Sequence, residues 1–279
     1  MKNKKFKYIK NVVGWILIFL LGQSIGTVVG LNSMPRDQYE LYLNDNLDFD
    51  VISEIVSNPM LLGGIIAVLL FVIINIIRKR LTACDTIKGI TKEYLSLYKL
   101  EDRKSYILYF ILGISINIVI SFILTLITLF LSVSEADVEV SAMPQNLLMV
   151  ILVAFAVPIM EEILFRNRIY SNLAAISPEG GRVLQAALFG VMHGLSIQGF
   201  YTFYISFLFL NENEYHNSLL PSILMHCGLN FVAAMSILLP SFSIYIFIIG
   251  CICCIITLIN IKKVVHLRKQ KLNYNNYFN

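Results

Sequence analysis

The chain has 279 residues, of which 57% are hydrophobic and only 14% are charged. A soluble domain carries about 25% charged residues, so this composition excludes a soluble enzyme, a nucleic-acid-binding protein and a disordered scaffold. The net charge of +4 therefore describes loops beside a lipid surface and gives no sign of a nucleic-acid partner.

Apolar runs of membrane-spanning length predict an all-α polytopic membrane protein with about eight transmembrane helices. The first run, 12–31, follows a basic N-terminal segment. It is longer than the apolar core of a signal peptide, and no A-x-A type cleavage site follows it, so we predict a retained span. The other candidate spans are 60–77, 106–131, 147–165, 183–198, the short 199–210, 219–239 and 242–261.

The distribution of basic residues predicts the orientation. With a cytoplasmic N-terminus and eight spans, 21 of the 22 Lys and Arg residues lie on the cytoplasmic side, and only Arg36 lies outside. Both termini are then cytoplasmic. The chain is predicted to be one integral-membrane domain, 1–279, with a motif-bearing core at about 143–239 and a cytoplasmic tail at 262–279.

Polar residues inside apolar spans are rare and mark functional sites. The fourth predicted span contains two adjacent glutamates, Glu161 and Glu162, followed by Arg166. Glu162 and Arg166 stand at positions i and i+4, so they can pair along one face of a helix. Adjacent helical residues point about 100° apart, which leaves Glu161 to face a polar cavity.

Two further spans each contain a histidine. His193 follows Phe189 by four residues, so an aromatic wall can stand beside the imidazole. His226 precedes Asn230 by four residues, so both side chains can project from one helical face into one cavity. We expect all of these groups to lie between the cytoplasmic surface and the middle of the bilayer.

This set of side chains suits hydrolysis of an amide without a protein nucleophile. A glutamate and a neutral histidine can hold a water and remove its proton, while a second histidine and an asparagine amide can donate to a developing oxyanion. The sequence contains no H-E-x-x-H and no G-x-S-x-G motif, and no Asp lies in an apolar span. We expect no cofactor; a zinc site at Glu161, His193 and His226 is the chemical alternative.

The three motifs resemble those of the CPBP family, which comprises CAAX-type prenyl endopeptidases and bacterial abortive-infection (Abi), bacteriocin-processing and immunity proteins. The motifs are Glu161-Glu162-x-x-x-Arg166, Phe189-x-x-x-His193 and His226-x-x-x-Asn230, in this order on successive spans. The resemblance implies an eight-helix intramembrane endopeptidase that depends on a glutamate and has a cavity open to the cytoplasm; whether it requires a metal is left open.

The resemblance also implies a role for each residue. Glu161 and His193 would activate the water, and His226 and Asn230 would stabilise the oxyanion. Glu162 and Arg166 would support the site, with Phe189 beside it.

The resemblance and the composition together suggest the substrate. Eukaryotic members of the family cut after a prenylated cysteine, whereas the abundance of Lys, Asn and Ile suggests an AT-rich bacterial genome. We therefore expect a membrane-associated peptide or protein, such as a pheromone or bacteriocin precursor, to be cleaved at the cell membrane. The alternatives are a non-catalytic bacteriocin-immunity or signalling scaffold protein, and a transporter that uses the Glu and His residues as a proton relay.

Overall fold

The computed structural model describes most of the motif-bearing core and the helices that pack on it. The described residues are 2–33, 35, 36, 40, 59, 62–67, 69, 70, 73, 103–131, 150–235, 247–253 and 255–259. Every regular element among them is a helix, which confirms the all-α class. The predicted tail at 262–279 lies outside the described residues, as do large parts of the predicted spans 60–77 and 242–261.

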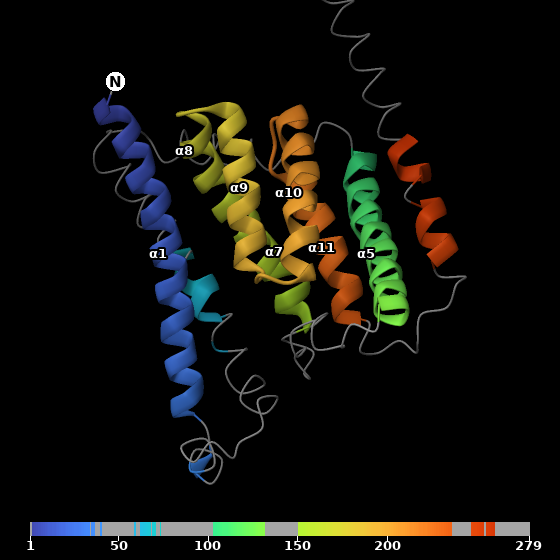
Figure 1. Ribbon diagram of the computed structural model, residues 1–279, viewed down its shortest axis with the longest axis horizontal. Coiled ribbons are helices and arrows are strands. Elements are labelled where there is room, and N and C mark those ends of the chain that lie inside the picture. Colours follow the sequence, from blue (N-terminus) through green and yellow to red (C-terminus); the bar gives the residue numbers. More distant parts are fainter. Residues whose placement is uncertain are drawn as a thin grey trace, which may run out of the picture.

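Figure 1 shows α1 at one side of the molecule and α5 toward the other, with α8, α9 and α10 between them. The elements are α1 (Lys2–Asn32), α5 (Arg103–Leu131), the π-helix η2 (Leu152–Ala156), α7 (Val157–Glu162), the π-helix η3 (Ile163–Tyr170), α8 (Ser171–Ala174), α9 (Pro178–Met192), α10 (Ile197–His216) and α11 (Leu220–Met235).

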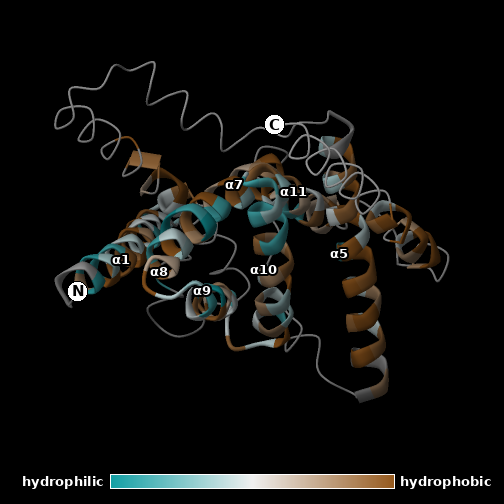
Figure 2. Cartoon of the chain, turned by 90° about the horizontal axis from the view of Figure 1, so that it is seen from above, coloured by the Kyte–Doolittle hydropathy of each residue, from teal (hydrophilic) through white to brown (hydrophobic). Residues whose placement is uncertain are grey.

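Two of the described helices, α1 and α5, are long and apolar enough to cross a membrane. The apolar parts are Lys5–Asn32 and Tyr106–Ile127, which include most of the first and third predicted spans. Figure 2 shows the hydrophobic character of α5 along its length. The number of eight spans and the cytoplasmic position of both termini stay predictions.

The fourth predicted span, 147–165, is helical from residue 150 but is not wound uniformly. The π-helix η2 precedes Pro158, the second residue of α7, and a second π-helix follows Glu162. Proline has no N–H to donate, so the backbone before it must adjust, and π-helical turns are one such adjustment. The helical winding therefore changes next to Pro158.

The fifth and sixth predicted spans have different bounds in the structure. α9 begins at Pro178, where the Ser177 side chain accepts a hydrogen bond from the Gly180 N–H, and it ends at Met192. The chain then turns and α10 begins at Ile197, instead of continuing to residue 198 as predicted. The turn contains Gly194 with φ of +94°, a backbone conformation that favours glycine. A helix-period pattern in the sequence does not reveal such a turn.

The close packing of α5 on α11 also positions the site. A Cβ at Gly113 of α5 would collide with the carbonyl oxygen of Met225, and a Cβ at Gly228 of α11 would collide with the carbonyl oxygen of Phe110. Small residues let helix backbones approach in membrane proteins. Because Met225 and Gly228 flank His226 along α11, this contact determines where the His226 side chain is presented.

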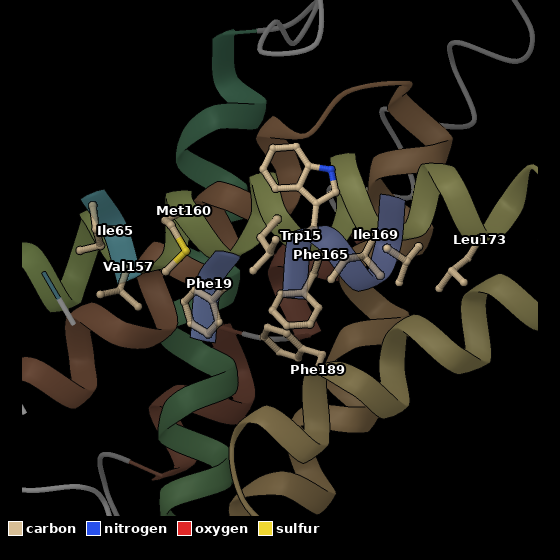
Figure 3. Packing of buried hydrophobic residues seen from close by; sticks show 11 residues of the cluster. Trp15, Phe19, Ile65, Val157, Met160, Phe165, Ile169, Leu173 and Phe189 are labelled. Atoms are coloured by element: carbon tan, nitrogen blue, oxygen red, sulfur yellow. The ribbon is translucent and has the colours of Figure 1, made fainter. Parts of the chain in front are cut away.

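Two clusters of buried hydrophobic side chains meet at the site. The first joins Trp15 and Phe19 of α1 to side chains of α7, η3 and α9, as Figure 3 shows. The second joins α5 to α10 and α11. Phe189 belongs to the first cluster and Phe209 to the second, and both rings contact the imidazole of His226. The site therefore lies at the junction of the two clusters.

Candidate active site

The two adjacent glutamates lie where the helix changes from α to π winding. α7 ends at Glu162, and η3 begins at the next residue. π-helical turns are rare and occur frequently at functional sites. Glu161 and Glu162 point toward different groups, as the sequence predicts for neighbours on a helix. The end of α7 thus supplies two carboxylates, one near Nε2 of His226 and the other near Nδ1 of the same ring.

Glu161 lies beside both histidines. Its Oε2 atom is 3.6 Å from Nε2 of His226 and 4.0 Å from Nε2 of His193. These separations are too long for direct hydrogen bonds, and a single bridging water suits them. The three side chains come from α7, the end of α9 and α11, so three sequence motifs meet at one point. All three are largely buried, with 14% of the Glu161 side chain exposed.

The partners of the two imidazole rings determine where their hydrogens lie. His193 has Nδ1 2.8 Å from the Phe189 carbonyl oxygen, and His226 has Nδ1 2.9 Å from Glu162 Oε1. A carbonyl oxygen and an ionised carboxylate oxygen only accept, so both Nδ1 atoms donate. In the neutral rings, each Nε2 then carries a lone pair and faces Glu161. Two nitrogen acceptors and a carboxylate oxygen surround one position. A water at this position could donate its two hydrogens to two of these three acceptors.

His193 is not within a helix, although the predicted span 183–198 includes it. It is the residue that follows α9, with φ of −92° and ψ of 8°. Its backbone N–H still bonds to the carbonyl of Gly190, and its ring packs on Phe189 with a centroid separation of 4.6 Å. The aromatic wall predicted from the four-residue spacing is therefore present, although a turn and not a helix carries the histidine.

Glu162 and Arg166 form the i, i+4 pair expected from their spacing. The Arg166 NH1 atom is 3.1 Å from Glu162 Oε1, and both side chains are buried. The guanidinium also lies over the Phe189 ring, with 4.2 Å from its carbon to the ring centroid. Because Glu162 Oε1 also accepts from His226, one oxygen joins the ion pair to the imidazole.

Asn230 has a different immediate partner from the one expected of an oxyanion donor. Its Nδ2 donates to the carbonyl oxygen of Val153 at 3.1 Å, which ties α11 to η2. On the same side of α11, the Cys227 thiol lies 3.9 Å from the Phe155 carbonyl oxygen. The four-residue spacing does place His226 and Asn230 one helical turn apart, but the hydrogen bond of Asn230 goes to the backbone. An amide NH2 has a second hydrogen, and any role at the site depends on it.

Sequence analysis missed three residues next to the site: Gln185, Ser206 and Phe209. Gln185 precedes Phe189 by four residues, and His193 follows Phe189 by four, so one line along α9 could have indicated it. Ser206 lies on a buried polar stripe of α10 with Thr202 and Asn213. The spacing along the helix could have suggested this polar stripe. Only the fold shows that Ser206 lies behind Arg166.

No group of three or more His, Cys, Asp or Glu side chains in the described part of the chain is arranged to hold a metal ion. The zinc alternative at Glu161, His193 and His226 thus rests on the types of donor atom and not on a preformed ligand set. The Nδ1–H groups of both histidines have hydrogen-bond acceptors, and histidines that bind zinc also donate their other ring N–H to an acceptor.

Two described helices long enough and apolar enough to cross a membrane, together with a largely buried Glu–His–His cluster, suit a helical membrane protein with a hydrolase-like site. Residues 143–232 match the family model of Rce1-like type II CAAX prenyl endopeptidases. This match supports the predicted relationship to the CPBP family. No curated protein and no solved structure matches the chain.

Proposed function

We propose that this protein is an intramembrane endopeptidase that hydrolyses a peptide bond with a water activated by Glu161 and His193. The observation that carries the proposal is the convergence of Glu161 Oε2 with the Nε2 atoms of His193 and His226 at 3.6–4.0 Å. The Rce1-like domain, which has the same class of activity in its family name, supports it.

In the proposed reaction the water oxygen attacks the carbonyl carbon of the peptide bond while Glu161 and His193 take its proton. The carbonyl oxygen becomes an oxyanion, which we assign to the N–H groups of His226 and Asn230. His226 donates from Nε2 once the proton that Glu161 took from the water has passed to this nitrogen. That proton then passes to the leaving amine as the C–N bond breaks, and the products are a carboxylic acid and an amine.

Each supporting residue has a role in this proposal. Glu162 holds His226 through Nδ1, and Arg166 balances the charge of Glu162. Phe189 packs against Arg166, His193 and His226, and so excludes water from one side of the site. A low-water site strengthens the electrostatic interactions that stabilise charge in the transition state.

The proposed substrate is a membrane-associated peptide or protein, since two of the helices packed around the site, α1 and α5, are long and apolar enough to cross a membrane. We place the active site in the cytoplasmic half of a multi-pass cell-membrane protein, following the distribution of basic residues in the sequence. A pheromone or bacteriocin precursor of a bacterial host is the class to test first. The proposed mechanism uses no metal, and the zinc alternative is tested separately below.

The test is cleavage of candidate precursor peptides by the purified full-length protein in detergent. Glu161→Gln and His193→Ala should each reduce kcat by at least about 100-fold, the contribution expected of a general base. Glu179→Gln, an exposed glutamate in the first turn of α9, is the matched control and should retain activity. Full activity in both site variants would refute the assignment and favour a binding or scaffold role.

The metal requirement is tested with the same preparation. Active protein should contain no stoichiometric zinc and should keep its activity after treatment with a chelator. If the chelator abolishes activity and only zinc restores it, a metal ion activates the water in place of Glu161 and His193.

A further inference from the structure

A chain of buried polar side chains extends behind the proposed site and is not used by the reaction itself. It runs from Gln185 of α9 through Ser206 of α10 to Arg166 of η3, and from there through Glu162 to His226. Gln185 and Ser206 are fully buried. Buried polar groups that form a connected network hold their neighbours in one arrangement, so we asked what this network orients.

Ser206 is the point where two donors meet. Its hydroxyl oxygen accepts from Gln185 Nε2 at 2.7 Å and from Arg166 NH2 at 3.2 Å. A guanidinium has five N–H donors and no acceptor, so only acceptors can fix its orientation. Arg166 forms an ion pair with Glu162 Oε1 and donates from Nη2 to Ser206 Oγ, while its buried Nε and Nη1 atoms make no hydrogen bond.

The second anchor of Arg166 therefore decides how the guanidinium meets Glu162. Without the Ser206 hydroxyl, the Glu162 oxygen and the rings of Phe189 and Phe209 would still hold the cation. One ion pair and two ring faces leave it able to rotate in its plane. Rotation would move NH1 relative to Glu162 Oε1, which is 3.1 Å away.

The same oxygen, Glu162 Oε1, accepts from His226 Nδ1 at 2.9 Å. The Glu162 oxygen keeps the hydrogen of His226 on Nδ1, and so leaves Nε2 directed at Glu161. A displaced Arg166 therefore changes the acceptor on which this arrangement depends. In histidines the partner of one ring nitrogen sets the state of the other. The path from Ser206 to the reacting position is thus three contacts long and continuous.

We propose that Ser206 and Gln185 are positioning residues: through Arg166 and Glu162 they hold His226 with Nδ1 protonated and Nε2 directed at Glu161. Ser206 acts directly on Arg166, and Gln185 keeps the Ser206 hydroxyl in place. The consequence for activity rests on the proposed peptidase function, whereas the consequence for the imidazole does not.

The first measurement is the nitrogen NMR spectrum of the full-length protein in detergent, with ¹⁵N-labelled histidine rings. The His226 signals are assigned as those that disappear in His226→Gln. In the wild type, His226 should show the pattern of an Nδ1–H ring. Ser206→Ala should shift these signals toward a mixture of the two tautomers, and Ser206→Thr, which retains a hydroxyl, should restore the wild-type pattern.

Thr202→Val is the matched control, because Thr202 is a buried hydroxyl one turn earlier on α10 whose bonds go to the backbone carbonyls of Gln198 and Gly199. It should leave the His226 signals unchanged. Should Ser206→Ala fail to fold, Gln185→Met removes the other donor to Ser206 and should give a smaller shift in the same direction.

The second measurement is steady-state cleavage. Ser206→Ala should lower kcat about 10- to 100-fold with little change in KM, which is the usual effect of removing an outer partner of a site residue. Unshifted His226 signals in Ser206→Ala and Gln185→Met would overturn the inference, whatever the rates. If the wild type cleaves nothing, the proposed function fails, and the spectra still decide the positioning role.

Discussion

The Nδ1 atom of His226 lies 2.9 Å from Oε1 of Glu162, although the two residues are 64 positions apart in the chain. The same oxygen is 3.1 Å from the Arg166 guanidinium. A carboxylate, a guanidinium and an imidazole thus share one buried oxygen. Next to them, Glu161 faces the other nitrogen of His226 at 3.6 Å. Adjacent glutamates therefore contact opposite sides of one ring, which gives them separable effects.

Exchanging each glutamate for glutamine should separate stability from activity. Glu162→Gln leaves the Arg166 cation buried without its counter-charge, and breaking such a pair costs about 3–5 kcal/mol. Glu161→Gln removes no ion pair with Arg166 and should unfold within about 1 kcal/mol of the wild type, the range of substitutions that break no such feature, while losing activity. Thermal unfolding in detergent, measured beside peptide cleavage, tests both. Equal losses of stability in the two variants would contradict this division.

Tyr109→Phe should weaken the attachment of α5 to α10. The Tyr109 hydroxyl is buried, donates to Glu212 Oε2 at 2.7 Å and lies 2.7 Å from His216 Nε2. Removing it leaves these polar groups without their shared partner, at a cost of about 1–3 kcal/mol. Tyr204→Phe, which alters an exposed tyrosine of α10, is the control and should unfold as the wild type does. Matching unfolding temperatures in the two variants would refute a structural role of the hydroxyl.

The stability of this attachment should also depend on pH through Glu212, which lies in the polar end of α10 beyond the apolar segment predicted to end at residue 210. Burial raises the pKa of Glu212, against a smaller opposite effect of the Tyr109 hydrogen bond. A carboxyl whose pKa is higher in the folded state binds more protons there than when unfolded. Its contribution to stability is complete below its ordinary pKa and is lost as the pH rises through the folded pKa.

Glu212→Gln removes this titration and provides the measurement. Between about pH 4 and about pH 7, a range that begins near the ordinary pKa of a glutamate, the unfolding temperature of the wild type should fall relative to that of the variant. A difference between the two proteins that stays constant with pH would show that Glu212 does not titrate in this way.

Alanine at either glycine of the α5–α11 contact should displace His226. Gly113→Ala and Gly228→Ala each place a methyl group against a backbone carbonyl oxygen of the facing helix. Overpacking of this kind costs about 1–3 kcal/mol, and it moves the helix that presents His226, so kcat should also fall.

Gly14→Ala is the matched control for these two changes, because a Cβ at Gly14 of α1 meets no atom within 4 Å. It should leave both unfolding and cleavage unchanged. Wild-type kcat in Gly113→Ala and Gly228→Ala would mean that the α5–α11 spacing does not position the histidine.

Several features of the site could be predicted because they depend on neighbours along one helix. The pairing of Glu162 with Arg166 and the stacking of Phe189 beside His193 follow from four-residue spacing. Three motifs on successive apolar segments also predicted that Glu161 and the two histidines meet. Short-range geometry and the cost of polar groups in lipid were enough for these conclusions.

Other features depend on contacts between segments distant in sequence, and spacing could not predict them. The end of α9 before His193 requires the positive φ of Gly194, which a hydrophobic pattern does not show. The hydrogen bond of Asn230 goes to the Val153 carbonyl, made available beside α11 by η2. Likewise, Gln185 and Ser206 lie behind Arg166 only because α9 and α10 pack as a hairpin against η3.

The sparse 14% of charged residues and their arrangement predicted from sequence alone an all-helical membrane protein whose polar groups gather at Glu161, His193 and His226. They could do so because an ionisable side chain in an apolar segment is costly and is kept for a use. Only the tertiary structure decided which atom of each side chain faces which atom of its neighbours. Hydrogen-bond partners, and with them the positions of the imidazole hydrogens, come from side chains and backbone carbonyls that the folded helices bring together.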